Sequence, residues 1–220
     1  SRNLTSKDSV YSAHRSHAHL LALGADLRSV FAEILGKSTG VSGGFGGSMH
    51  LIDKSVGFQG SVPIVAGTVP LALGSAFAAK YKKSNEIAVA YFGDGAIEEG
   101  VVHECLNIAA LMHLPILFIC ENNYMASHMH LSQRQSLGNL NRFASANGIE
   151  SSRLDGNDPL LITNEISKKI EIIRKTQKPF FYPPPPKKKL CLNTQKTKTT
   201  VLEQQNAQQK QFFLCLMLKK

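Results

Sequence analysis

Apolar and polar residues follow one another in blocks whose lengths and periods predict alternating strands and helices. Apolar runs rich in β-branched residues predict buried strands at 87–92, 115–120 and 149–154. Apolar residues at helical spacing predict helices at 27–35, 69–81, 99–112, 134–147 and 158–175. Asp26 is the expected cap of the first helix, and Gly36 its expected end. Strands that alternate with helices of this size indicate an α/β fold, a parallel sheet with helices on both faces.

A change in composition near Pro179 divides the chain into two expected regions. All 17 glycines lie at or before Gly156, whereas four prolines and three lysines fill 183–189 and Gln, Lys and Thr dominate beyond them. Such a segment cannot readily build a packed core. We therefore expect an α/β domain at 1–179 and a tail at 180–220 that is disordered or a gene-model artefact. A ligand for an SH3-type domain is the alternative interpretation of the proline run.

The formal net charge of +9 belongs to the tail and not to the expected domain. Residues 1–179 hold 17 Lys and Arg against 15 Asp and Glu, whereas residues 180–220 hold 8 Lys against one acid, Glu203. No aromatic or groove-reading motif accompanies the basic tail, and no apolar run has the length of a membrane span. We therefore expect neither a nucleic-acid nor a membrane partner, with a nucleic-acid-binding module kept as an alternative.

Four cysteines occur without a CxxC pair. Cys105 and Cys120 fall in apolar segments, on an expected helix and an expected strand, so we expect reduced thiols in the core.

The segment with the clearest chemistry joins the first two expected strands. Gly93-Asp94-Gly95 follows the strand at 87–92, and Asn122-Asn123 begins 29 residues after Gly93, behind the strand at 115–120. A β-α-β unit brings the carboxyl ends of its two strands to one edge of the sheet. Hard oxygen ligands beside a glycine turn and a helix start suit a divalent cation that holds a diphosphate. An Asx turn or a helix cap is the structural alternative for Asp94.

Gly93-Asp94-Gly95 with Asn123 is similar to the thiamine diphosphate signature, and the wider chain resembles the α subunit of 2-oxoacid dehydrogenase E1 components. This group includes the pyruvate, branched-chain and acetoin dehydrogenases. The resemblance covers residues 9–179 in order and includes the segments 14–19, 43–50, 62–65, 93–123 and 154–158. It implies the diphosphate-binding module of the thiamine diphosphate-binding fold, truncated at both ends.

By this resemblance, three groups would bind Mg²⁺. They are the carboxylate of Asp94, the side-chain oxygen of Asn123 and the backbone carbonyl of Met125. Diphosphate oxygens and a water would complete the octahedron.

The resemblance also assigns contacts to the cofactor itself. Gly95 and Ala96 would offer backbone N–H groups to the diphosphate, beside the metal ligands Asp94 and Asn123, and Arg15 would clamp the phosphate. Val65 would bind the aminopyrimidine through its backbone. A surface arginine and a plain buried strand end are the alternatives for Arg15 and Val65.

Two pairs of histidines have a spacing that also suits zinc. His17 with His19, and His128 with His130, lack a completing Cys or acidic cluster. We expect them to line the mouth of the active site or to pack locally.

The resemblance implies oxidative decarboxylation of a pyruvate-like 2-oxoacid and acyl transfer to a lipoyl carrier, with thiamine diphosphate and Mg²⁺ as cofactors. The activating glutamate would lie on a β subunit of an α2β2 assembly, so no catalytic residue is assigned in this chain. A lipoyl-bearing E2 component is the further partner. The compartment would be cytoplasmic in a bacterium, and mitochondrial matrix or plastid in a eukaryote.

Several alternatives remain. The chain could be an inactive fragment of such a subunit or another thiamine diphosphate enzyme, such as an acetoin dehydrogenase or a transketolase-like protein. A nicotinamide-binding protein would need a GxGxxG turn between a strand and a helix, a context that residues 43–47 do not fit.

Overall fold

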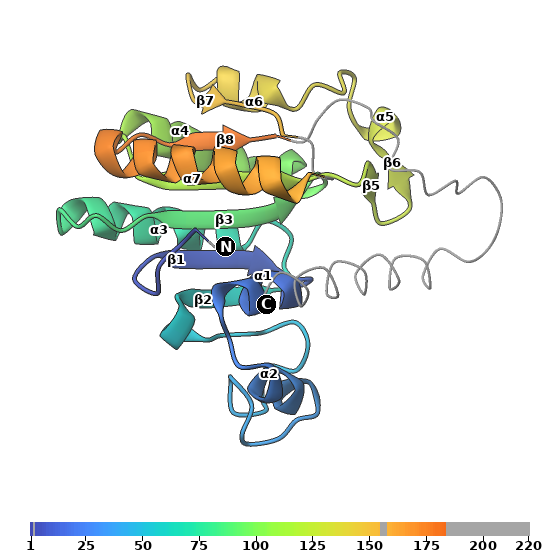
Figure 1. The fold of residues 1–220 in the computed structure, drawn as a ribbon. Coiled ribbons are helices and arrows are strands. Elements are labelled where there is room, and N and C mark those ends of the chain that lie inside the picture. The colour runs from blue at the N-terminus through green and yellow to red at the C-terminus, as the bar shows by residue number, and fades with distance from the viewer. Residues whose placement is uncertain (2, 155–157, 184–220) are drawn as a thin grey trace.

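A six-stranded sheet lies at the centre of the computed structural model, which describes residues 1, 3–154 and 158–183 (Figure 1). The strand order is β2-β1-β3-β4-β8-β7, and every pairing in this sheet is parallel. Its strands are β1 (Ser9–Ala13), β2 (Phe58–Val62), β3 (Ala88–Gly93), β4 (Ile116–Glu121), β7 (Glu150–Ser151) and β8 (Phe180–Tyr182). A separate antiparallel hairpin pairs β5 (Met125–Ala126) with β6 (Met129–His130). The expected parallel α/β fold is confirmed.

Helices cover both faces of the sheet. The helices are α1 (His17–Leu23), α2 (Leu27–Ile34), α3 (Thr68–Tyr81), α4 (Gly100–Leu111), α5 (Leu131–Arg134), α6 (Asn141–Ser145) and α7 (Pro159–Thr176), with short 3-10 turns η1 (Lys54–Val56) and η2 (Ala96–Glu98). One core cluster lies between the sheet and α3 and α4, and the other lies on the face of α1 and α7. No helix in the described part of the chain is long and apolar enough to cross a membrane.

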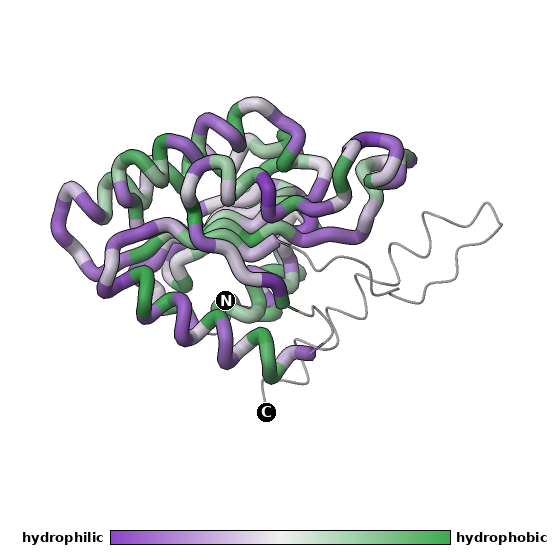
Figure 2. The backbone as a smooth tube through the Cα atoms, turned by 90° about the horizontal axis from the view of Figure 1, so that it is seen from above, coloured by the Kyte–Doolittle hydropathy of each residue, from purple (hydrophilic) through white to green (hydrophobic). Residues whose placement is uncertain are grey.

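The central strand β3 shows why its sequence is continuously apolar. Ala88, Ala90 and Phe92 pack in the cluster with α3 and α4, whereas Val89 and Tyr91 pack in the opposite cluster. Successive side chains of a strand point to opposite faces, so a strand covered on both faces needs apolar residues at every position. Figure 2 shows these largely hydrophobic strands enclosed by helices that carry hydrophilic residues along their length.

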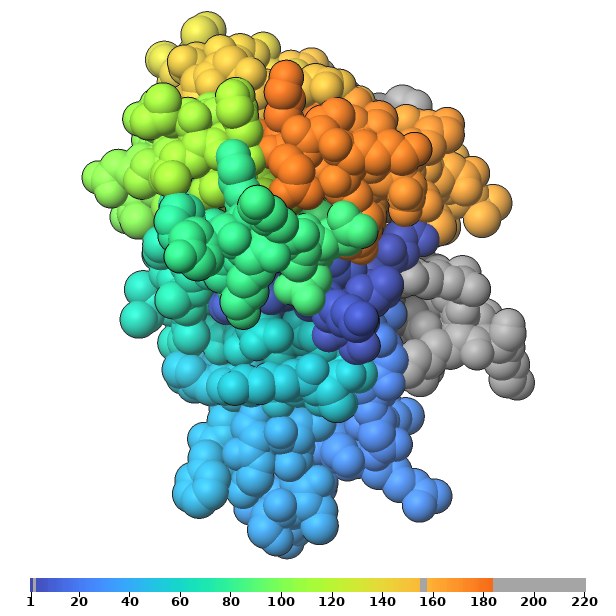
Figure 3. Space-filling view, turned by 90° about the vertical axis from the view of Figure 1, so that its left-hand side faces the viewer, coloured from blue at the N-terminus to red at the C-terminus, as the bar shows by residue number. Residues whose placement is uncertain are grey.

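The glycine-rich loop after α2 is built around one buried carboxylate. Glu33 is fully buried and accepts backbone N–H bonds from Ser42 (2.7 Å), Gly44 (2.8 Å) and Gly46 (2.6 Å). Burial acts to raise the pKa of Glu33, but these donors outweigh it and hold the pKa below its usual value. A Cβ at Gly46 would lie 2.0 Å from the carbonyl oxygen of His50. The glycines therefore let the chain wrap closely around Glu33, in a lobe beyond β2 (Figure 3).

The prediction of one helix at 134–147 is wrong. Two short helices, α5 and α6, replace it, and the chain between them is not helical. His130 caps α5 by accepting the Ser132 N–H, so the helix starts earlier than expected. Gly138 and Asn139 then favour a turn, and the Asn139 side chain accepts the N–H of Asn141 at 3.1 Å. Local side-chain to backbone bonds thus replace the helical hydrogen bonds.

The ordered fold also continues past the expected boundary at Pro179. Phe180, Phe181 and Tyr182 form β8, which is buried and pairs with both β4 and β7. The rest of the predicted tail, from residue 184 onwards, lies outside the described residues.

The predicted cap of α2 is confirmed, because the Asp26 side chain accepts the Ser29 N–H at 2.8 Å.

The cysteines in the described residues agree with the expectation. Cys105 and Cys120 are buried and form no disulfide, and burial raises the pKa of the Cys105 thiol to about 11. Cys191 and Cys215 lie outside the described part of the chain.

A buried ion pair fastens α7 to the first turn of the chain. The Arg174 guanidinium donates to both carboxylate oxygens of Asp8, at 2.9 and 2.7 Å, and Asp8 is fully buried. The same carboxylate accepts the backbone N–H groups of Thr5 (2.8 Å) and Ile87 (3.0 Å). Burial acts to raise the pKa of Asp8, but Arg174 and the two backbone donors outweigh it and lower the pKa.

Asp8→Asn is expected to cost about 2–3 kcal/mol of unfolding free energy at neutral pH, because it leaves the partly exposed Arg174 without its carboxylate. The folded pKa of Asp8 lies below its unfolded value of 3.8, so its contribution is full above that pH and disappears as the pH falls through the folded pKa. Denaturant titrations from about pH 6 to pH 3 should therefore show a shallower loss of stability in the variant.

Glu165→Gln is the matched control, because Glu165 pairs with Lys168 on the exposed face of α7. It should change stability by less than about 0.5 kcal/mol. An Asp8→Asn variant as stable as this control would contradict the assigned role.

Candidate functional site

The carboxyl ends of β3 and β4 lie level with each other. Their register runs from Ala88 opposite Ile116 to Gly93 opposite Glu121, and the Asp94 N–H continues it by donating to the Glu121 carbonyl at 3.0 Å. The strand ends therefore bring the two halves of the predicted motif together, as the β-α-β interpretation required. The backbone N–H of Asn123 donates to the carboxylate of Asp94.

Asp94 is a buried carboxylate with one charged partner. Only 2% of the residue is exposed, and its Oδ2 accepts a hydrogen bond from Arg134 at 2.6 Å. The same guanidinium also binds Glu98. Burial raises the pKa of Asp94 above its usual value, although Arg134 and the Asn123 N–H act in the opposite direction. The site therefore holds a negative charge that is expensive to bury and that favours a bound cation.

The two asparagines turn the chain out of β4. The Asn122 side chain accepts the N–H of Tyr124 at 2.7 Å, and the Asn123 side chain accepts the N–H of Met125 at 2.9 Å. Tyr124 adopts a φ of 63° between them. The turn delivers Met125 to the start of β5. An amide oxygen has two lone pairs, so Asn123 can accept this N–H and still bind a cation.

Gly95 is required by the hairpin that packs against it. A Cβ at this position would lie 2.8 Å from the Cβ of Ala126 in β5. Gly95 caps the short turn η2, in which Ala96 and Ile97 are buried, and α4 begins only at Gly100. The N–H groups that we expected at the start of the long helix therefore belong to a separate 3-10 turn.

Arg15 and Val65 follow the neighbouring strands at the same edge. Arg15 comes two residues after β1 and Val65 three residues after β2, and these strands lie next to β3 in the order β2-β1-β3-β4. Both side chains are exposed, Val65 by 56%. Their predicted contacts to a cofactor remain predictions.

Two of the four histidines with HxH spacing pack locally, as expected. His19 bonds to Ser12 (2.8 Å) and to Glu121 (3.0 Å), and it stacks on Tyr91 with ring centroids 4.1 Å apart. His130 uses its Nδ1 to cap α5. Within the described ranges, no group of three His, Cys, Asp or Glu could hold a metal ion.

The sequence interpretation missed Arg134, which the structure brings onto both Asp94 and Glu98. The sequence did contain a signal for this residue. Arg134 is the only Lys or Arg between Lys83 and Arg142, in a stretch that contains six acids. A lone cation among acids near a buried motif is a candidate partner for that motif.

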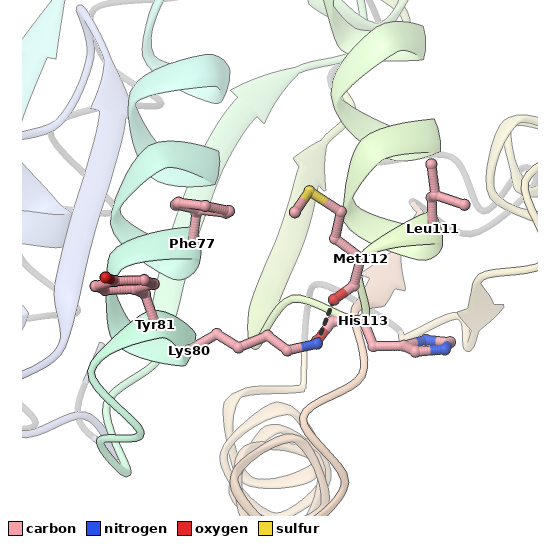
Figure 4. Close-up of a pocket in the computed structure, with 6 residues that line it drawn as sticks. All are labelled: Phe77, Lys80, Tyr81, Leu111, Met112 and His113. Atoms are coloured by element: carbon pink, nitrogen blue, oxygen red, sulfur yellow. Dashed lines mark hydrogen bonds between the residues drawn. The ribbon is translucent and has the colours of Figure 1, made fainter.

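An open hollow on the molecule lies elsewhere. Phe77, Lys80 and Tyr81 of α3 line it together with Leu111, Met112 and His113 at the end of α4, and Figure 4 shows Lys80 reaching across to the Met112 carbonyl. These helix ends lead into the starts of β3 and β4, so the hollow is at the edge of the sheet opposite Asp94. Phe77 and Tyr81 are 46% and 82% exposed, so the last turn of α3 is open to solvent on this side.

The donor set around Asp94 fits a hard divalent cation. It combines a buried carboxylate, an amide oxygen at Asn123 and the peptide carbonyl of Met125, and oxygen ligands of these kinds are what Mg²⁺ prefers. These residues come from two adjacent strand ends and the hairpin behind them. They make the carboxyl edge of this parallel sheet the candidate place for a bound cation.

Comparison of the whole chain with known proteins identifies its family. Residues 1–181 match the family described as "Dehydrogenase E1 component". The α subunit of acetoin:2,6-dichlorophenolindophenol oxidoreductase from Bacillus subtilis is 40% identical over 172 residues, which are 78% of this chain and 52% of that protein. The pyruvate dehydrogenase E1 component subunit α of Rickettsia felis is 37% identical over 172 residues, 78% and 53% of the two chains.

The chain belongs to the dehydrogenase E1 component family, and its similarity is to the α subunits. It spans about half the length of the curated relatives it matches. Solved structures show the same fold. A putative thiamin diphosphate-dependent enzyme from Mycobacterium smegmatis has a TM-score of 0.52 at 16% identity, covering 84% of this chain and 30% of that one. Transketolase from Campylobacter jejuni has a TM-score of 0.52 at 23% identity, covering 80% and 28%.

Gly95→Ala is expected to displace the β5–β6 hairpin, because its Cβ would overlap Ala126. Overpacking of this size costs about 1–3 kcal/mol, so the free energy of unfolding should fall by that amount in a denaturant titration. Gly100→Ala is the control, since nothing lies within 4 Å of its Cβ. Equal stabilities of the two variants would contradict the requirement for glycine.

Proposed function

We propose that this chain is the cofactor-binding α subunit of a 2-oxoacid dehydrogenase E1 component, binding thiamine diphosphate through Mg²⁺. The activity is oxidative decarboxylation of a pyruvate-like 2-oxoacid, with transfer of the acyl group to a lipoyl carrier. The observation that carries the proposal is the buried Asp94 carboxylate, joined to Asn123 at the carboxyl edge of β3 and β4. Membership of the E1 family supports it.

The residues of this chain would hold and orient the cofactor. Asp94, Asn123 and the Met125 carbonyl would bind the cation, and the cation would bind the diphosphate. Gly95 and Ala96 would donate backbone N–H groups to phosphate oxygens, in the first turn of η2. The cofactor, once bound, supplies a carbanion and an electron sink for decarboxylation.

Arg15 and Val65 would complete the binding surface from the neighbouring strand ends. Arg15 would pair with a phosphate oxygen, a contact for which a guanidinium is suited. Val65 would hold the aminopyrimidine through its backbone. The order β2-β1-β3-β4 supports this arrangement, because it sets the four loops side by side along one edge.

The partners belong to the same proposal. A β subunit would supply the glutamate that activates the cofactor, in an α2β2 assembly, and a lipoyl-bearing E2 component would accept the acyl group. Exposed apolar residues on α3 and α4, among them Phe77, Tyr81 and Leu111, support a protein partner. The compartment stays a prediction that depends on the source organism.

Acetoin is the second candidate substrate. The relative from Bacillus subtilis acts on acetoin by its name and is 40% identical, at least as similar as the pyruvate dehydrogenase subunits described above. Parallel assays of the assembled enzyme with pyruvate, branched-chain 2-oxoacids and acetoin would separate these candidates.

Asp94→Asn is expected to weaken metal-dependent binding of thiamine diphosphate by at least about 100-fold, since it removes the only charged ligand of the proposed site. The measurement is calorimetric titration with Mg²⁺ and again with excess chelator. Asp53→Asn is the matched control, because Asp53 caps η1 away from the site and asparagine can cap equally well. Metal-dependent binding that survives in Asp94→Asn would refute the metal assignment.

The chain alone is expected to show at least ~100-fold less 2-oxoacid decarboxylation than a mixture with a family β subunit, because a general acid–base group would be missing. The assay measures carbon dioxide release with the cofactor and Mg²⁺ saturating. Full activity of the purified chain by itself would show that the β subunit is not needed.

A further inference from the structure

We propose that Arg134 is an internal counter-cation that competes with the divalent metal for Asp94, so that cofactor loading requires the guanidinium to leave this carboxylate. The inference rests on the proposed function, because it takes Asp94 as a metal ligand. It goes beyond that function by assigning Arg134 a role in controlling when the metal can bind.

The contacts of Arg134 place a buried positive charge against two acids. One guanidinium nitrogen lies 2.6 Å from Asp94 Oδ2, and the other bonds to Glu98. Its Nε donates to the carbonyl of Met129 at 3.3 Å. The side chain is 6% exposed and that of Asp94 3%, so water contributes little to either charge. Each charge is therefore balanced mainly by the other.

A metal ion at Asp94 would disturb this balance. Mg²⁺ needs carboxylate oxygens at about 2.0–2.1 Å and brings two positive charges. Two cations at one buried carboxylate repel each other strongly, because the surrounding protein screens charge poorly. Arg134 has a second acceptor in Glu98, whose side chain is 27% exposed, so it can release Asp94 without losing every partner.

The exchange involves the same segment that provides a proposed metal ligand. Met125 begins the β5–β6 hairpin and Arg134 ends α5, which follows it directly. The Leu131 N–H donates to the Tyr124 carbonyl at 2.7 Å and closes this segment on itself. Arg134 thus ties Met129 of the hairpin to Asp94, so movement of its guanidinium would act on the same short segment that carries Met125.

The test compares wild-type chain with Arg134→Gln, using Mn²⁺ as the probe and following free Mn²⁺ by electron paramagnetic resonance. The full 220-residue chain is used, with and without thiamine diphosphate. Arg134→Gln is expected to bind Mn²⁺ about tenfold more tightly than wild type. Arg142→Gln is the matched control, because Arg142 lies in α6 and bonds to Gln135 and not to Asp94. Its Mn²⁺ affinity should equal that of wild type.

A second readout separates competition from a merely structural role. In chelator, Arg134→Gln should unfold at a lower temperature than wild type, because Asp94 is left buried without a cation. Saturating Mn²⁺ should remove or reverse that difference. Arg134→Lys, which keeps the charge with fewer donors, should bind with intermediate affinity and keeps the test valid if the glutamine variant fails to fold.

The outcomes distinguish this inference from the proposed function. Binding by wild type with equal or weaker affinity in Arg134→Gln would overturn the inference alone, and would make Arg134 a residue that positions Asp94. No Mn²⁺ binding by any of the variants, with cofactor present, would overturn both the inference and the metal site.

Discussion

Hydrogen bonds between β3 and β4 continue in register to Gly93 and Glu121, so the two strands end at the same level. Everything at the candidate site depends on this pairing. It brings Asp94 beside Asn123, although the two residues are separated by a helix and a strand in the sequence. Parallel strands need a long crossover, and the right-handed crossover through α4 returns the chain to the same edge. A shift of one residue would move either side chain to the other face.

Three carboxylates are buried in the described part of the chain, and the way each one is balanced differs. Asp8 has a bidentate arginine and two backbone donors, and Glu33 has three backbone donors. For both, these partners outweigh burial and lower the pKa. Asp94 accepts one hydrogen bond from Arg134, and the N–H groups of Asn123 and of Asp94 itself also act to lower its pKa, but burial outweighs them and the pKa is raised. A buried carboxylate whose partners do not offset burial is a candidate functional group, which agrees with the place of Asp94 in the candidate site.

The errors of the sequence interpretation have a common physical origin. The strands β1 and β2 were not expected, because their segments, SVYSA and FQGSV, mix small and polar residues with few large apolar ones. They are strands because β1 pairs with β3 and β2 pairs with β1, with α3 packed against both. The helix expected over 134–147 had the right apolar spacing, but capping and turn bonds by His130 and Asn139 divided it. Short elements depend on their neighbours more than on their own periodicity.

Local patterns in the sequence predicted the fold class, the central strands and the helices α2, α3, α4 and α7, and they singled out Asp94 and Asn123 as the candidate site. Long apolar periods and glycine turns express these features without help from distant residues. Only the tertiary structure decided that β8 lies between β4 and β7 and that Glu33 organises the glycine loop. It alone brought Arg134, 40 residues further along, onto Asp94. Such pairings arise from burial and charge balance between distant segments, which no local pattern encodes.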